Sequence, residues 1–444
     1  MDLNAISEKL IKACLKKGAD GAEVYIESGR TLSLEVRNGE VETVEEASSQ
    51  GAGLRVFLKG RMAFASSNDL RPESLEAAAD RAVGFARITT ADENNVLPDD
   101  RTTIEVPGLY DPAIAGVPLA RKIELAKTVE KLAMADKRIS KSGGAGYGEG
   151  ETEIVIANSL GLRKSRRASS CSLGVSVVAE KGEQKTDGSE SCQRRFFADL
   201  KKPEEIAAKA AQDAIGMLDP RMVKTQRAAV IFDPDTAGAL LGGILAAVHG
   251  ERVLQKASFL ADKLGRLIAS PLLTVIDDGT RPKGPASTPF DGEGVTVQKR
   301  LIIDKGVLRG FLYNTAVAKR AGTKSTGNAS RGGFTGLPGI GPHNFFLAAG
   351  TSKTTDILAS TKTGLWLKEV TGYGINPVNG QFSGGASGFW IENGKVAFPV
   401  KGLTVAGTAE EMLMGLDAVA DDLDLDRGVT GPTFRIKSLQ IGGE

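Results

Sequence analysis

The two histidines are the side chains best suited to bind a metal or to act as a base at neutral pH. They are His249 and His343, which lie 94 positions apart, and the 444-residue chain has no others. A helical zinc site needs two histidines about one turn apart on one helix. Glu251 is two residues from His249, so these side chains do not share a helix face. The sequence therefore predicts no metal site, and a capping or hydrogen-bonding role for His249 near a helix end.

Other arrangements of nucleophiles and acids are weaker candidates for catalysis. A serine nucleophile would need one of the two histidines as its base, and the glycines around Ser387 lack the spacing of a nucleophile elbow. His343 is expected at a strand start, as a surface or edge histidine. The carboxylate pairs Asp277-Asp278 and Asp291/Glu293 fall in polar loops, which favours turn-forming or solvated roles. The sequence thus predicts no catalytic residue.

Hydrophobic periodicity and turn residues indicate the elements that would position these side chains. Asn38-Gly39 between two alternating arms is the strongest short hairpin signal, and Lys59-Gly60 marks a second hairpin. Stripes with a period of 3.6 predict helices over about residues 2–17, 72–88, 118–137, 203–218 and 236–256. We therefore expect an α+β fold. It would have an N-terminal domain of helices and antiparallel hairpins (1–220) and a C-terminal domain (221–444), mostly antiparallel β with one central helix.

The central helix has the most distinctive composition. Residues 237–247 are almost all small or aliphatic, with Gly242-Gly243 in the middle. Two glycines inside a helix cost about 1–2 kcal/mol relative to alanine. A helix that keeps them is expected to lie close against another backbone.

The composition excludes several classes of protein. Lys and Arg number 56 against 55 Asp and Glu, so no overall field would attract nucleic acid or an anionic membrane. The basic cluster at 163–167 is interpreted as a solvated strand face, because no aromatic residue interleaves with it. The three cysteines have no close spacing, and the first segment predicts an amphipathic helix rather than a signal peptide. The cytoplasm is the expected location, and no stretch approaches the ~18 apolar residues of a membrane span.

Short motifs recur along nearly the whole chain in a specific order. In the N-terminal half they are GADGAEV (18–24), RNGEVE (37–42), GAGLRV (51–56) and GRMAFAS (60–66). In the C-terminal half they are VIDDGT (275–280), DGEG (291–294), STGN (325–328), IENGK (391–395) and PVKG (399–402). Each motif alone is weak, but their order and spacing together resemble the PmbA/TldD family, and specifically its PmbA branch, also called TldE.

In the TldD branch, the resemblance implies, the central helix carries a His-Glu-x-x-x-His motif. Its histidines hold zinc, its glutamate is the general base, and a cysteine in a late glycine-rich loop completes the site. The positions of this sequence that match the motif are Gly242, Gly243 and Ala247, and no cysteine follows Cys192. Motif and third ligand are lost together, as expected of the partner branch rather than of one damaged enzyme.

The resemblance thus implies a non-catalytic PmbA/TldE-type subunit of a TldD/TldE-like metalloprotease complex that degrades or processes peptides. It implies no cofactor in this chain, zinc in a TldD-type partner, a heterodimer with that partner and, for the chain alone, a homodimer. A peptide is expected to bind extended, by strand addition, at residues 327–344 and 381–388. Arg331 and Asn344 are the predicted substrate-binding residues.

Two alternative functions stay open. One is a stand-alone hydrolase with chemistry other than zinc's, and the other is a regulatory binding protein. The older family name, modulator of DNA gyrase, points to the second alternative, although the balanced charge gives no sign of direct DNA contact. Whether the chain is an enzyme is therefore left open, with inactivity of the isolated chain expected from the absent motif.

Overall fold

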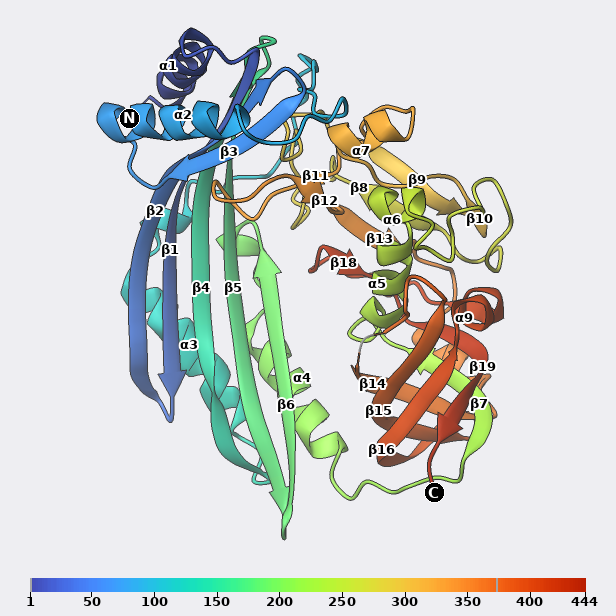
Figure 1. The fold of residues 1–444 in the computed structure, drawn as a ribbon. Coiled ribbons are helices and arrows are strands. Elements are labelled where there is room, and N and C mark those ends of the chain that lie inside the picture. Colours follow the sequence, from blue (N-terminus) through green and yellow to red (C-terminus); the bar gives the residue numbers. More distant parts are fainter. Residues whose placement is uncertain (1, 373) are drawn as a thin grey trace.

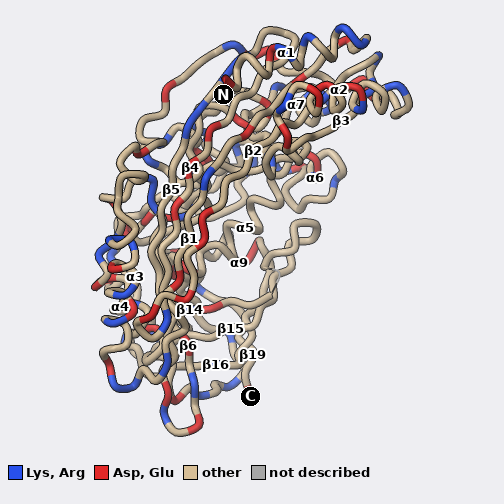
Figure 2. Tube along the Cα trace, turned by 90° about the vertical axis from the view of Figure 1, so that its left-hand side faces the viewer, with Lys and Arg blue, Asp and Glu red and all other residues tan. Residues whose placement is uncertain are grey.

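The computed structural model describes residues 2–372 and 374–444, and their fold is α+β, as the sequence predicts. A tall antiparallel sheet formed by the N-terminal half stands beside a strand-rich C-terminal half (Figure 1). In the view turned by 90°, Lys and Arg are interspersed with Asp and Glu along the trace (Figure 2). No helix in the described ranges is long and apolar enough to cross a membrane. The division into domains 1–220 and 221–444 stays a prediction.

The N-terminal sheet has six strands in the order β3-β2-β1-β4-β5-β6, and all neighbours are antiparallel. Its strands are β1 (Gly21–Arg37), β2 (Glu40–Leu58), β3 (Arg61–Ser67), β4 (Ile139–Asn158), β5 (Arg163–Lys181) and β6 (Gln184–Arg194). The helices that cover one face are α1 (Leu3–Lys16), α2 (Pro72–Ala86), α3 (Leu119–Ala133) and α4 (Pro203–Gly216). Because side chains alternate across a strand, even-numbered β1 residues pack under these helices. The odd-numbered ones lie on the opposite side, here called the inner face, which meets the C-terminal half.

The two predicted N-terminal hairpin turns are confirmed. Asn38 and Gly39 have φ angles of 53° and 77°, and Lys59 and Gly60 have φ angles of 50° and 76°. Two successive residues at positive φ are what a two-residue type I′ turn requires. The turns set the register of β1, β2 and β3, and so decide which side chains reach the inner face.

The C-terminal half contains a second six-stranded sheet, in the order β16-β15-β14-β7-β19-β17. An additional pairing of β16 with β19 curls this sheet toward a barrel. Its strands are β7 (Gln226–Phe232), β14 (Thr363–Thr371), β15 (Gln381–Glu392), β16 (Lys395–Thr408), β17 (Leu416–Val419) and β19 (Phe434–Gly442).

Smaller elements connect this curled sheet to the N-terminal half. A five-stranded sheet has the order β10-β9-β8-β13-β18, with strands β8 (Val275–Asp278), β9 (Lys299–Asp304), β10 (Val307–Leu308), β13 (Asn344–Leu347) and β18 (Val429–Thr430). The strands β11 (Ala329–Ser330) and β12 (Gly339–Ile340) form a separate pair. The remaining helices are α5 (Gly238–Ala247), α6 (Gly250–Leu254), α7 (Thr315–Arg320), α8 (Thr354–Ala359) and α9 (Ala409–Gly415). Helix α5 lies in the main C-terminal core, where Leu240, Leu241 and Ile244 are fully buried.

The prediction of one continuous helix over 236–256 is wrong, because the structure has two separate helices there, α5 and α6. At His249 the backbone is extended, with φ −67° and ψ 114°. There the backbone forms strand-like hydrogen bonds with Leu312 in place of helical ones. The Gly250 N–H donates to the Leu312 carbonyl, and the Leu312 N–H donates to the Val248 carbonyl, both at 2.9 Å. A Cβ at Gly250 would lie 2.3 Å from the Tyr313 ring, so this crossing also requires glycine. The contact is non-local, which is why periodicity missed it.

Candidate functional site

The three positions that match the zinc motif lie on α5 and carry no donor atoms. A Cβ added at Gly242 would meet nothing within 4 Å, whereas one at Gly243 would lie 2.5 Å from the Cβ of Ile375. Ala247 is fully buried. A close approach by another segment is thus found at Gly243, where the Cβ of Ile375 is the nearest atom, and not at Gly242.

The residues of α5 therefore do not fit a zinc ion. Zinc is held by three or four sulfur, nitrogen or oxygen ligands from side chains, and glycine and alanine supply none. Within the two described ranges, no group of three or more His, Cys, Asp or Glu side chains is placed to hold a metal. The zinc that the family resemblance implies has no ligand set on this helix.

Neither histidine is arranged as a catalytic base. His249 occupies the N-cap position of α6, but its side chain makes no capping bond and its Nδ1 atom is buried without a partner. The expected capping bond is thus wrong, and burial, together with the charge of Arg252, lowers the pKa of this imidazole. His343 is buried rather than at a surface edge, and its Nε2 lies 2.6 Å from the Gly327 carbonyl oxygen. His343 is thus held by a local contact, whereas His249 lines a pocket with Glu251 and Glu293 and has no partner on its buried Nδ1, among the described residues, to orient it as a base.

Two of the four carboxylates, Asp278 and Asp291, organise turns as predicted, whereas Asp277 and Glu293 are buried and bond to distant segments, against the prediction. Asp278 Oδ1 accepts from the backbone N–H of Thr280 at 2.9 Å and from its hydroxyl at 2.7 Å. Asp291 accepts three backbone N–H bonds, from Glu293, Val295 and Ala329, each at 2.9 Å. Such bonds satisfy loop amides that burial has removed from water.

A buried network of four charges joins the inner face of the N-terminal sheet to the C-terminal half. Glu23 of β1 accepts from Arg55 Nε at 2.9 Å and Nη2 at 2.5 Å, and it also pairs with Arg331. Arg55 Nη1 reaches Glu293 at 2.9 Å. All four side chains are 6% exposed or less. Burial by itself raises the pKa of Glu23, but the two guanidinium groups outweigh burial and hold the pKa below its usual value.

The two residues predicted to bind substrate are occupied by partners in the chain. Arg331 pairs with Glu23 and donates from Nε to the Gly292 carbonyl at 2.6 Å. Asn344 is fully buried, where its side chain donates to the Asp278 carbonyl at 2.5 Å and accepts from the Ala286 N–H at 3.0 Å. A peptide would have to displace these bonds, and peptide binding by either residue stays a prediction.

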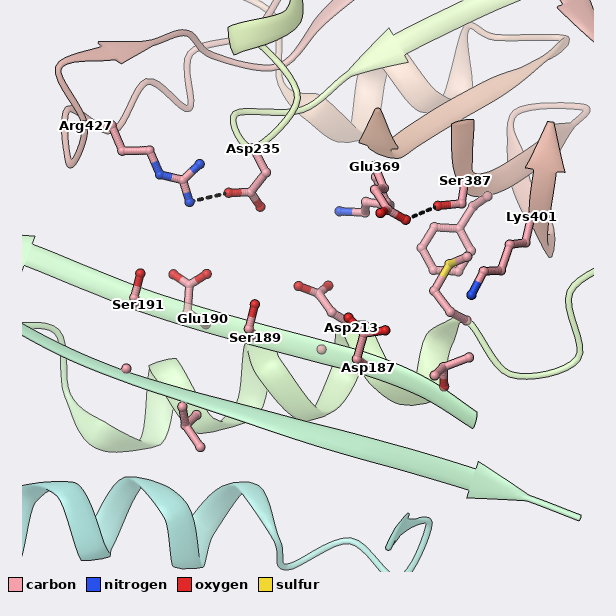
Figure 3. Close-up of a pocket in the computed structure, with 17 residues that line it drawn as sticks. Asp187, Ser189, Glu190, Ser191, Asp213, Asp235, Glu369, Ser387, Lys401 and Arg427 are labelled. Atoms are coloured by element: carbon pink, nitrogen blue, oxygen red, sulfur yellow. Dashed lines mark hydrogen bonds and ion pairs between the residues drawn. The ribbon is translucent and has the colours of Figure 1, made fainter. Parts of the chain in front are cut away.

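A polar groove runs between the two halves and has a volume of about 470 Å³. One wall is β6 together with Asp213 of α4, and the other is built from β14, β15 and β16 with Asp235 and Arg427 (Figure 3). Asp235 lies in the turn before α5, pairs with Arg427 at 2.9 Å and pairs with Lys209 of α4 at 3.0 Å. The groove thus opens beside the N-terminal end of α5, and sequence reasoning missed it because its walls are far apart in the chain.

The wall formed by β6 is a strand with one free edge. Strand β6 pairs with β5 only, so its other edge has no strand partner within the described residues. The two strands are joined by a two-residue turn closed by Lys181 and Gln184, and no bulge interrupts their register. Hydrogen-bonded and non-hydrogen-bonded pairs alternate in antiparallel strands. It follows that Asp187, Ser189 and Ser191 direct their backbone N–H and C=O groups away from β5, along the groove.

The predicted strand addition at 381–388 does not fit the topology. This segment lies in β15, which is paired with β14 on one side and β16 on the other. Residues 385–388 are paired on both edges, and at 381–382 the second edge is bridged by residues 375–376. The segment therefore offers its side chains to a peptide, and not free backbone groups. Ser387 is one of these side chains: it lines the groove and donates to Glu369 at 2.7 Å (Figure 3).

Three models of one protein family match the chain in succession. They are described as PmbA/TldA metallopeptidase domain 1, matching residues 22–86, the central domain, matching 112–218, and the C-terminal domain, matching 225–443. A relative from Escherichia coli O157:H7 named metalloprotease PmbA is 33% identical, across 96% of this chain and 93% of that protein.

Solved structures with the same fold match the whole length. A crystal structure of a putative modulator of DNA gyrase from Bacteroides thetaiotaomicron has a TM-score of 0.92 and 27% identity, covering 100% of both chains. A crystal structure of TldE from Thermococcus kodakarensis has a TM-score of 0.91 and 26% identity, covering 99% of this chain and 100% of that one. Sequence and fold therefore agree on one family.

Proposed function

The chain belongs to the PmbA/TldD family of metallopeptidases, and from this membership we propose that it is a non-catalytic PmbA/TldE-type subunit of a TldD/TldE-like metalloprotease complex. The complex would degrade or process peptides. Zinc and the general base would belong to a TldD-type partner, and this chain would shape the chamber and hold the substrate. Its location would be the cytoplasm, as a heterodimer with the partner or, alone, a homodimer.

The observation that carries this proposal is the chemistry of the motif positions. The side chains at these positions are a hydrogen atom at Gly242 and Gly243 and a methyl group at Ala247. The related branch would have two imidazoles and a carboxylate there. A glycine or alanine neither ligates a metal nor moves a proton, so no step of zinc-assisted hydrolysis has a residue here to perform it. The surroundings of the histidines support the same conclusion for histidine-assisted hydrolysis, because His343 is buried against a backbone carbonyl and the buried Nδ1 of His249 has no partner among the described residues.

The groove supplies a physical basis for holding an extended peptide. An edge strand binds a peptide through main-chain hydrogen bonds, which makes binding largely independent of sequence. Strand β6 presents such an edge at Asp187, Ser189 and Ser191. Across the groove, Lys401 and Ser387 offer polar side chains to the peptide. This arrangement suits a subunit that positions diverse peptides for a partner's active site.

The test is peptide cleavage by the chain alone, by a TldD-type partner from the same genome alone, and by the two together, each with and without a metal chelator. We expect full cleavage only from the pair, and its loss with chelator. Chelator-sensitive cleavage by this chain alone would overturn the proposal. Cleavage by this chain alone that survives the chelator would favour the stand-alone hydrolase instead.

A matched pair of variants tests the peptide-holding edge. Ser189→Pro removes one free backbone N–H from β6 without removing a bond to β5, because Ser189 is not a hydrogen-bonded partner of that strand. Ser189→Ala keeps the N–H. In the two-subunit assay we expect the proline variant to raise KM severalfold and the alanine variant to leave it unchanged. Equal KM values for both variants would exclude strand addition at this edge.

A further inference from the structure

A second cavity, of about 470 Å³, lies on the inner face of the N-terminal sheet, under the loop at 285–288. We call it the inner-face pocket, and it is lined by Glu27, Arg166, Arg195, Ser287 and other residues of β1, β4 and β5. Its volume falls in the range of about 300–1,000 Å³ that is usual for small-ligand sites. Neither the zinc-motif helix nor the groove along β6 contributes a residue to it.

The register of the sheet places one acid and one arginine on the floor of this pocket. Glu27 of β1 lies opposite Ile154 of β4, and Ile154 lies opposite Arg166 of β5. All three therefore project from the same face of the sheet. The next residue along β5, Arg167, projects from the other face, where it stacks over Tyr110. The basic cluster of the sequence is thus divided between two faces, and the solvated interpretation is wrong for Lys164, which is buried, and incomplete for Arg166, which is half-buried.

Arg166 has no neutralising partner in the described part of the chain. Its guanidinium makes no ion pair within 4 Å and no side-chain hydrogen bond there, although an arginine carries five N–H donors. Burial lowers its pKa, and the more distant Tyr25 and Glu27 offset that effect only in part. Arg331, at the edge of the same pocket, differs because Glu23 neutralises it.

Arg195 adds a second positive charge that is held in place but not neutralised. Its guanidinium donates to four backbone carbonyls, those of Ser169, Gly284, Pro285 and Ser287, at 2.7–3.2 Å. These bonds fix the group under the loop and leave one N–H unused. Burial, with the like charge of Arg166, lowers the pKa of Arg195 to about 10. The two arginines therefore repel each other across the pocket.

Glu27 is the acid that lines the pocket, and it does not cancel these charges. It lies beside Gly333, where an added Cβ would be 3.2 Å from its Oε2. No cation within the described ranges approaches it to ion-pair distance, and burial raises its pKa against a smaller opposing effect of the Arg166 charge. The pocket therefore holds more positive than negative charge, in a place where water is partly excluded.

We propose that the inner-face pocket binds a carboxylate of the peptide, with Arg166 as the binding residue. An arginine fork binds a carboxylate with two parallel N–H···O bonds, which are stronger than bonds between neutral groups. The carboxylate is either the peptide's C-terminus or an Asp or Glu side chain. The identity of the ligand as a peptide rests on the proposed function, whereas the preference for a carboxylate rests on the unneutralised arginines.

The test uses the full chain and three fluorescent hexapeptides of alanine, measured by anisotropy. One has a free C-terminus, one has a C-terminal amide, and one has the amide with a single internal glutamate. We expect at least one carboxylate-bearing peptide to bind tenfold or more tightly than the plain amide. Preference for the free C-terminus or for the internal glutamate identifies which source the pocket recognises.

Matched variants assign the effect to the pocket. Arg166→Gln should abolish the preference for the carboxylate-bearing peptide over the plain amide. Arg167→Gln makes the same change of charge on the opposite face and should preserve that preference. Glu27→Gln should tighten binding of the preferred peptide severalfold, because it removes a like charge. An unfolding curve for each variant verifies that it is folded.

Each remaining outcome counts against the proposal. Equal binding of all three peptides overturns the carboxylate site but leaves the peptide-holding role intact. Discrimination that survives Arg166→Gln, or a Glu27→Gln variant that binds more weakly, also overturns the site. Binding of no peptide, together with normal cleavage by the two-subunit complex, would overturn the site and keep the proposed function.

Discussion

The Glu23→Gln substitution should be among the most damaging single changes to the stability of this chain. The buried network balances Glu23 and Glu293 against Arg55 and Arg331. Glutamine is nearly isosteric, but it leaves one buried positive charge uncompensated, and it turns an amide toward two guanidinium groups. Removal of one partner from a buried ion pair costs about 3–5 kcal/mol.

The expected shift in melting temperature follows from the size of the chain. An unfolding entropy of about 2.1 cal/mol/K per residue gives about 0.9 kcal/mol/K for 444 residues. A loss of about 3–5 kcal/mol then lowers the Tm by about 3–5 °C if the chain unfolds as one unit. Urea unfolding measures the free energy directly, and calorimetry measures the Tm.

The matched control is an exposed ion pair in the same sheet. Arg30 and Glu46 pair at 2.8 Å, with about half of each side chain exposed. Exposed pairs contribute at most about 1 kcal/mol, so Glu46→Gln should change the free energy of unfolding little. A Glu23→Gln variant within 1 kcal/mol of the wild type would refute the reasoning, because the network would then carry no uncompensated charge.

The same carboxyl makes a prediction about pH. The folded-state pKa of Glu23 is lower than its unfolded value of about 4.3. Its contribution to stability is therefore complete above about pH 4.3 and is lost as pH falls through the folded-state pKa. The difference in unfolding free energy between the wild type and Glu23→Gln should be constant from pH 6 to 8 and shrink below about pH 4. A difference that grows on acidification would contradict this sign.

Further predictions concern the central helix and the cysteines. Gly242→Ala should stabilise the chain by about 0.5–1 kcal/mol, because its Cβ enters open space in a helix. Gly243→Ala at the neighbouring position should destabilise the chain by about 1–3 kcal/mol, because its Cβ collides with Ile375. Urea unfolding measures both variants, and changes of the same sign in the free energy of unfolding would disprove the assigned packing. Burial raises the pKa of Cys14 to about 11 and of Cys171 to about 12, so a thiol reagent at pH 8 should label them only in unfolded protein. Rapid labelling of native protein would show that these cores open.

Local rules were sufficient for several elements. The turn at Asn38-Gly39 needs two residues at positive φ, and the dipeptide Asn-Gly is the residue pair that most readily adopts it. Four helices of the N-terminal half also follow from the spacing of their apolar residues, since each has one face to bury. The missing donors at Gly242 and Gly243 are a matter of residue type, so no fold was needed to find them.

Contacts between distant segments decided the features that local rules missed. The central helix breaks at His249 because Leu312 pairs with it there. Glu23 meets Arg331 although 308 residues separate them. The basic residues at 163–167 cannot be told apart from the sequence. The register of β4 against β5 decides that Arg166 lines a pocket and that Arg167 projects from the opposite face.

The sequence by itself determined the family, the α+β class, the hairpin turns and the absence of ligand atoms at the zinc-motif positions. These depend on residue types and on spacings of a few residues, where backbone sterics and side-chain chemistry act directly. Only the tertiary structure decided which strand keeps a free edge and which arginine lacks a counter-ion. Both depend on what the rest of the chain places nearby, and that is a property of packing rather than of any one segment.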